Sequence, residues 1–223
     1  MRNRFRMLRT PPVLALGVMG FWLLTGCSSV YNATMEHVFG YEKRELLKKS
    51  VAALQEEQKD AQAEFTDALT QLKALYGFDG GELESFYGKV KTSHERCERQ
   101  AREVQSRIEK MEKIARSMFA EWESELQEYR NANLAAASRA QLQQTRERYT
   151  QLSQTVRAAE AAMQPVLGQL KDNVLFLKHN LNASAIGALQ GEAAGIQQQI
   201  EELLRQMNAS IAESDRFIQS LPK

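Results

Sequence analysis

The residues best suited to chemistry are a histidine and a cysteine three positions apart. His94 and Cys97 lie in a segment of helical periodicity, so both side chains are expected on one helix face. An imidazole and a thiolate at this spacing are half of a zinc site, which needs four ligands, or three and a water. No third ligand stands at a useful spacing, and the pattern favours a core histidine beside a small buried cysteine. A thiol sensor at Cys97 would need an exposed sulfur.

Four glutamates surround a tryptophan further along the chain, and they are the other candidates for a metal. They are Glu121, Glu123, Glu125 and Glu128, around Trp122. Di-metal sites in helical bundles use Glu-x-x-His, and none of the three histidines has a glutamate three residues before it. The chain also lacks G-x-S-x-G, a P-loop and G-x-G-x-x-G. We expect a solvated acidic face, no metal, no cofactor and no enzyme.

The first 26 residues have the layout of a secretory signal peptide. Four arginines and no acidic residue precede an apolar stretch from Val13 to Leu24. The sequence Leu24-Thr25-Gly26-Cys27 follows and resembles the bacterial lipobox, in which the cysteine thiol accepts a diacylglycerol thioether. The alternative is a transmembrane anchor with an incidental cysteine, but the agreement of all three features favours lipidation at Cys27.

Lipidation would place the protein on a membrane. Three acyl chains are expected on a lipoprotein of this kind, and two already give stable anchoring. Ser28, in place of an aspartate, indicates the outer membrane, with the protein facing the periplasm. Removing the four arginines of the leader from the 29 basic residues leaves 25 against 28 acidic residues, a net charge of −3. This balance argues against nucleic acid as a partner.

The remainder of the chain is predicted to be all-α. Breaks at 77–81, 131–133 and 182–184 divide residues 33–220 into helices of about 33–76, 82–130, 134–181 and 185–220, after the leader (1–26) and a lipidated cysteine with a short tether (27–32). Short connections make successive helices antiparallel, which predicts an elongated up-down-up-down four-helix bundle or coiled coil. Pro165 is expected to kink or loosen the third helix.

Each helix carries an apolar seam with alternating steps of four and three. The first seam runs through Leu47, Val51, Leu54, Gln58, Ala61, Phe65, Ala68, Leu72 and Leu75. The second includes Tyr87, Val90, His94 and Cys97, and the fourth includes Leu203, Met207 and Ile211. The topology predicts that the C-terminus and the 131–133 turn share the end at which the anchored chain enters, with the other two turns at the opposite end.

Four blocks of the sequence are similar to a family of bacterial proteins, the domain of unknown function 2959. The blocks are Gly77-Phe78-Asp79-Gly80-Gly81-Glu82-Leu83-Glu84, the run from Asp172 to Ala183, Gly40-Tyr41-Glu42-Lys43-Arg44-Glu45, and Phe119-Ala120-Glu121-Trp122-Glu123-Ser124-Glu125-Leu126. The resemblance covers almost all of the chain after the leader. It implies an all-helical envelope protein, often a lipoprotein, and it brings no activity and no catalytic residue.

The end of the bundle away from the anchor is the candidate partner-binding tip. Its residues are Phe78, Asp79, Lys178, His179, Asn180 and Asn182. An aromatic ring among polar groups suits a protein partner, whereas a hydrogen-bonded cap of two helices is the simpler interpretation. We expect a non-enzymatic interaction or scaffold module that binds an envelope protein or itself. The alternative is a helical module that binds lipid or a small ligand, for which the alanine-rich stretches and Pro165 would leave a groove.

Overall fold

The computed structural model describes residues 40–76, 83–180 and 182–221, and these residues form four long helices. The helices are α2 (Gly40–Tyr76), α3 (Leu83–Glu125), α4 (Ala132–His179) and α5 (Ala183–Ser220). The leader, Cys27, the tether and the predicted helical residues 33–39 lie outside the described residues, as does the 77–81 turn. No helix in the described ranges is long and apolar enough to cross a membrane.

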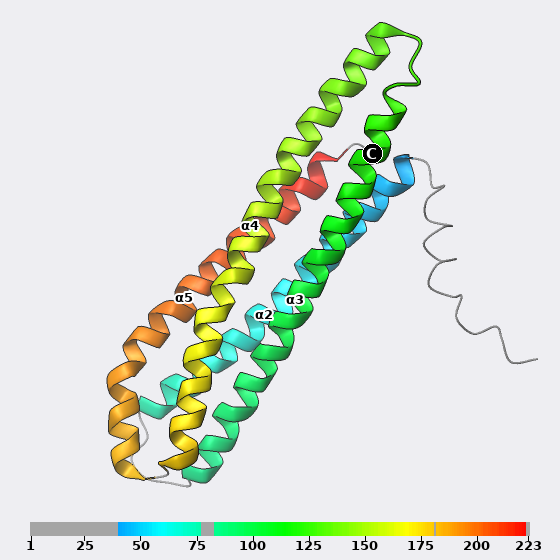
Figure 1. Ribbon diagram of the computed structural model, residues 1–223. Helices are drawn as coiled ribbons and strands as arrows, with labels where there is room; N and C mark the ends of the chain where they lie inside the picture. Colours follow the sequence, from blue (N-terminus) through cyan, green and yellow to red (C-terminus); the bar gives the residue numbers. More distant parts are fainter. Residues whose placement is uncertain (1–39, 77–82, 181, 222–223) are drawn as a thin grey trace, which may run out of the picture. The chain divides into compact units, whose positions relative to one another are not determined.

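The four helices form an antiparallel bundle in which each one packs against two neighbours (Figure 1). Helix α2 packs against α3 and α5, and α4 packs against the same two helices, so α2 and α4 lie on a diagonal. An ion pair of 2.9 Å joins Lys43 at the start of α2 to Glu121 near the end of α3, and this pairing requires the two helices to run in opposite directions. The predicted all-α bundle is confirmed.

The two ends of the bundle hold different helix termini, and we call the end at which α2 begins the near end and the opposite one the far end. At the near end, α2 begins, α3 turns into α4, and α5 finishes where Arg148 of α4 donates to the carbonyl oxygen of Ser220 at 3.2 Å. The α3–α4 hairpin extends beyond the other two helices at this end (Figure 1). At the far end, Phe86 and Val90 of α3 pack with Leu177 of α4 and Leu189 of α5 in a separate apolar cluster.

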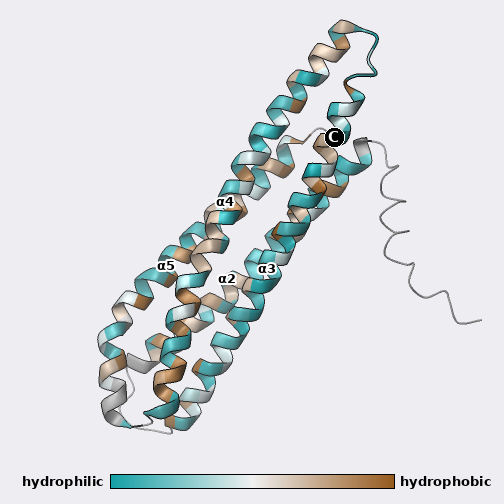
Figure 2. Cartoon of the chain, viewed as in Figure 1, coloured by the Kyte–Doolittle hydropathy of each residue, from teal (hydrophilic) through white to brown (hydrophobic). Residues whose placement is uncertain are grey.

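The core lies along the predicted seams, because each helix buries one stripe of apolar side chains. In α2, every predicted position from Leu47 to Leu72 is buried, including the polar Gln58. In α4, Leu152, Val156, Ala159 and Met163 are completely buried. Much of the remaining helix surface is hydrophilic (Figure 2). The favourable free energy of removing apolar surface from water therefore comes mainly from burial of these stripes.

Two seams depart by one residue from their predicted course. In α3, Ser93 is buried and His94 is half-buried, whereas His94 was expected in the core. The Ser93 hydroxyl donates to Asp67 of α2 at 3.4 Å, and its small size suits a close approach of the two helices. In α5, Ser210 and Ser214 are buried while Ile211 is only half-buried. Ser210 and Ser214 continue the alternating steps of four and three after Leu203 and Met207, whereas Ile211 would break that alternation.

The slip in α5 creates a buried polar layer between α2 and α5. The Gln58 side chain is fully buried and donates from Nε2 to Ser210 Oγ at 2.7 Å. On either side, Gln55 donates to Asp215 at 2.7 Å and Gln62 donates to Asn208 at 2.9 Å. Hydrogen bonds of this kind are satisfied in one alignment only, so the layer fixes the register of α2 against α5.

Helix α4 begins at a side-chain cap and continues through a proline. The Asn131 side chain accepts from the backbone N–H groups of Asn133 at 2.9 Å and Leu134 at 3.2 Å, which is the pattern of an N-cap. Pro165 lies inside α4, yet the helix is continuous from Ala132 to His179. The break between α3 and α4 covers residues 126–131, somewhat earlier than the predicted 131–133, and it ends in a capped helix start. Pro165 does not interrupt α4, and the kink expected there stays a prediction.

We predict that Ser210→Ala lowers the free energy of unfolding by about 1–3 kcal/mol, because it leaves the buried Gln58 amide without its acceptor. Gln58→Met removes the amide itself, and a lone serine hydroxyl can turn to the backbone carbonyl four residues before it. The double variant should therefore be more stable than the sum of the two losses predicts. Urea denaturation of the four proteins measures this coupling, and additive losses would contradict a paired layer.

Candidate functional site

The predicted partner-binding tip is described in part. Phe78 and Asp79 lie outside the described residues, so their proximity to the other tip residues stays a prediction. Lys178 and His179 are exposed in the last turn of α4. Asn180 ends that helix: its side-chain amide donates to the carbonyl oxygen of Phe176 at 2.9 Å, and its N–H donates to Leu177 O at 3.2 Å. Asn180 is thus a cap, and Asn182 follows it with its N–H on Asn180 O at 2.9 Å.

Two apolar side chains beside this cap were not identified from the sequence. Leu175 and Phe176 expose 46% and 37% of their surface, whereas Leu177 is completely buried. Leu170, Asn173 and Leu177 are the core positions of this part of α4, so residues 175 and 176 fall on its outer face. An apolar pair next to a lysine and a histidine is a surface that a protein partner can bury.

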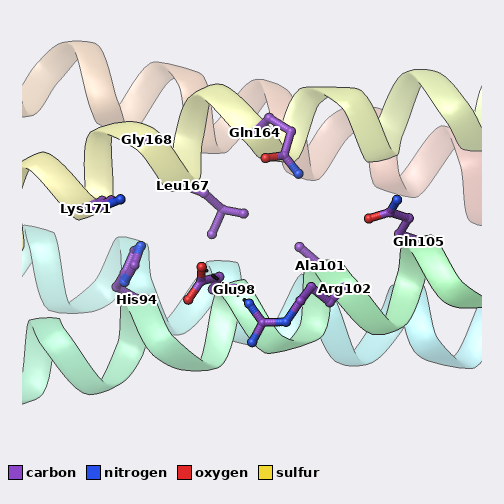
Figure 3. Close-up of a pocket in the computed structure, with 9 residues that line it drawn as sticks. All are labelled: His94, Glu98, Ala101, Arg102, Gln105, Gln164, Leu167, Gly168 and Lys171. Carbon is purple, nitrogen blue, oxygen red and sulfur yellow. Dashed lines mark ion pairs between the residues drawn. The ribbon is translucent and has the colours of Figure 1, made fainter.

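A groove runs between α3 and α4 toward the same end (Figure 3). Its volume is about 430 Å³, and it is open to solvent. His94, Glu98 and Arg102 of α3 face Gln164, Leu167 and Lys171 of α4 across it, with Gly168 beside them (Figure 3). A Cβ atom at Gly168 would meet nothing within 4 Å, so the missing side chain helps to keep the groove open.

Six of the nine residues that line the groove have polar or charged side chains, while about half of the exposed lining surface is apolar. Glu98 and Arg102 form an ion pair of 3.4 Å along α3, and Leu167 is a buried apolar residue of the lining. In the described part of the chain, no three histidine, cysteine, aspartate or glutamate side chains lie close enough to hold a metal ion. The lining therefore offers both hydrogen-bonding groups and apolar surface.

His94 and Cys97 do not form a common site. His94 borders the open groove, whereas Cys97 is completely buried in the core. Burial raises the pKa of the Cys97 thiol to about 12, with a further contribution from the negative charge of Glu64. The neutral thiol behaves as a small apolar side chain, so Cys97 packs in the core, as the seam pattern predicted.

The glutamates around Trp122 are engaged in structural contacts. Glu121 pairs with Lys43 of α2 at 2.9 Å, and Glu123 pairs with Arg146 of α4 at 2.8 Å. The hydrogen bond from Arg146 lowers the pKa of Glu123 below its usual value. Trp122 itself donates from Nε1 to Ser138 Oγ at 2.9 Å. At least two of the four glutamates therefore join helices, in place of the purely solvated acidic face that was expected.

The strongest of the described contacts between α3 and α4 is also an ion pair. Arg157 donates from Nε and Nη2 to the two oxygens of Glu112, each at 2.8 Å. This two-point contact lowers the pKa of the Glu112 carboxyl group, against the opposing effect of its partial burial. Glu112, Glu121 and Glu123 thus hold helices together. The candidate sites that remain are the exposed Leu175 and Phe176 with their neighbours and the groove between α3 and α4.

The comparison with protein families identifies one family. The model of the family described as a protein of unknown function (DUF2959) matches residues 31–221. The chain belongs to this family. The DUF2959 match covers all four described helices, so the bundle is the family domain. No curated protein and no solved structure matches the chain.

We predict that Cys97 resists thiol reagents at pH 8 in the folded protein and reacts fully in denaturant, because the reactive thiolate is suppressed by burial. The unfolded thiol ionises near its ordinary pKa of 9.0, whereas the folded one ionises near 12. The unfolded state therefore loses its proton first, and stability should fall between pH 9 and pH 12.

Mass spectrometry after alkylation counts the modified thiols directly. Cys97→Ala should reduce the alkaline loss of stability and provides the control. Rapid alkylation of native Cys97 would contradict the buried position.

Proposed function

We propose that this DUF2959 protein is a lipid-anchored, non-enzymatic interaction module of the bacterial envelope. The observation that carries the proposal is the separation of the two ends of the bundle. The chain enters α2 at the near end, where Lys43 pairs with Glu121, and the exposed Leu175–Phe176 pair lies at the far end. A partner bound at the far end is thereby held away from the point of attachment.

The anchor follows from the sequence before α2. The arginine-rich start, the apolar stretch and Leu24-Thr25-Gly26-Cys27 together support lipidation at Cys27, and Ser28 supports the outer membrane, with the protein facing the periplasm. Acyl chains on one residue make the bundle a surface-held domain, which needs no spanning helix of its own.

The far-end surface supports a protein partner. We define it by its described residues Leu175, Phe176, Lys178 and His179, all of them exposed. A partner that covers the two apolar side chains removes them from water, and the basic side chains favour an acidic rim on that partner. The partner is an envelope protein or a second copy of this chain. The groove between α3 and α4 exposes polar and apolar surface in nearly equal amounts, so it does not by itself favour a lipid-carrying interior.

Replacing the proposed lipid-acceptor residue tests the anchor. We predict that Cys27→Ser moves the protein out of the outer-membrane fraction, because serine lacks the thiol that forms the thioether. Mass spectrometry of the unaltered protein should find a chain that begins at Cys27 and carries acyl mass. Ser28→Ala is the matched control and should stay in the membrane. An unmodified Cys27 in a membrane-bound chain would contradict the lipid anchor.

Photo-crosslinking in cells tests the far-end surface. A photo-reactive residue in place of Phe176 should give a discrete adduct, and one in place of the exposed Gln144, on the near-end part of the same helix, should not. A heterologous adduct would identify an adaptor, and an adduct of two copies would identify an oligomeric scaffold. Equal labelling at both positions, or none, would contradict a partner at this surface.

Neighbouring substitutions separate partner binding from stability. Phe176→Ala should cost no more than about 1 kcal/mol of unfolding free energy, because 37% of the side chain is already exposed. Leu177→Ala should cost about 2–5 kcal/mol, because it opens a cavity in the far-end cluster. In the Phe176→Ala protein, a crosslinker placed at Leu175 should lose its adduct while the melting temperature falls much less than in the Leu177→Ala protein.

A further inference from the structure

The α3–α4 hairpin overhangs the near end of the bundle. Arg148 contacts Ser220, the last residue of α5, so the part of α4 from Ala132 to Arg148 passes the end of that helix. At 1.5 Å per residue this overhang is about 20 Å, allowing for the length of the arginine side chain. Trp122 binds Ser138 and Arg146 binds Glu123, which ties the two arms of the hairpin together.

The end of this overhang presents two large apolar side chains to solvent. Tyr129 and Leu134 expose 44% and 57% of their surface. Among the described residues, the other large exposed apolar side chains are Leu175 and Phe176, at the opposite end. The Asn131 cap holds the backbone N–H of Leu134 at 3.2 Å, so the first turn of α4 fixes where the leucine projects.

The chemistry of these two side chains indicates the occupant of this surface. A leucine and a tyrosine do suit the boundary between acyl chains and headgroups, where the tyrosine ring is apolar and its hydroxyl is wet. Glu128 and Arg130 are both exposed beside Tyr129, and their charges cancel. These two residues therefore neither attract nor repel anionic headgroups strongly, and the contact depends on the apolar side chains.

A lipid surface is within reach of this end. The proposed anchor, Cys27, precedes Gly40 by 13 residues, and a chain of that length spans at most about 45 Å when fully extended. That reach exceeds the overhang of about 20 Å. A tethered bilayer also has a high effective concentration at the hairpin, so a contact too weak to bind free vesicles is sufficient.

We propose that the α3–α4 hairpin docks on the lipid surface that carries the anchor, with Leu134 and Tyr129 inserted at headgroup level. The contact is a second attachment that orients the bundle, and it rests on the proposed lipidation of Cys27. It explains why the hairpin extends beyond α2 and α5, with its apolar side chains at the extremity.

Fluorescence quenching by lipid tests the docking. Two variants are purified from membranes as the full lipoprotein, Leu134→Cys and the matched Leu175→Cys, which replaces a similarly exposed leucine at the far end. Each introduced cysteine is labelled with the fluorophore NBD. Buried Cys97 and acylated Cys27 should take up no label, which the unsubstituted protein checks. The proteins are reconstituted in vesicles of phosphatidylethanolamine and phosphatidylglycerol that contain a doxyl-labelled lipid.

We expect quenching at position 134 to be at least about twofold stronger than at position 175, because the hairpin contacts the headgroup region. Tyr129→Ser in the Leu134→Cys protein should weaken this quenching. Equal, weak quenching at both positions in protein that floats with the vesicles would overturn the docking while leaving the anchor intact. A blue-shifted but unquenched NBD at 134 would mean that a second copy covers it, and would also overturn the lipid assignment.

Flotation of the same samples reports the anchor separately. Protein that fails to float would overturn the lipidation at Cys27, and with it the docking, because the tether argument would no longer hold. Flotation together with selective quenching at 134 supports both.

Discussion

Each of the four helices has one apolar stripe that water disfavours, and burial of all four stripes together determines the bundle. Because the stripes are long and continuous, the helices must lie side by side over most of their length. The buried stripes from Leu47 to Leu72 on α2 and from Leu142 to Leu177 on α4 span about three quarters of their helices. Short connections then leave only antiparallel neighbours. The separation of the two ends, on which the proposed function depends, is a direct consequence of that packing.

Apolar stripes alone allow neighbouring helices to slide, and polar contacts remove this freedom. Gln58 and Ser210 fix α2 against α5, while Arg157 and Glu112 fix α4 against α3 at two points. Lys43 and Glu121 fix the start of α2 beside the end of α3. The Lys43–Glu121 pair sets how far the α3–α4 hairpin extends past α2, because a shift of α3 against α2 by one heptad would move its end by about 10 Å.

The heptad pattern was sufficient to predict the fold, because burial of apolar stripes is the dominant force and its period is visible in the chain. The details that it missed are those in which small polar residues replace larger ones. Ser93 and Ser210 occupy core positions that the predicted seams assigned to His94 and Ile211, since the hydrogen-bond partners on the neighbouring helix are not visible in one helix alone. At the candidate site, the spacing of the core positions Leu170 and Leu177 already places residues 175 and 176 on the outer face of α4, so the heptad pattern could have identified this exposed apolar pair. Phe78 and Asp79 lie outside the described residues and stay predictions.

The thickness of the protein layer on a membrane tests most directly whether the bundle is attached at one end and presents the other. Helix α4 has 48 residues, which corresponds to about 72 Å at 1.5 Å per residue. Neutron reflectometry of the lipoprotein in a supported bilayer should therefore find protein density extending roughly 70 Å from the headgroups. A layer only about 20–25 Å thick, the width of two packed helices, would mean that the bundle lies flat, and would contradict the account.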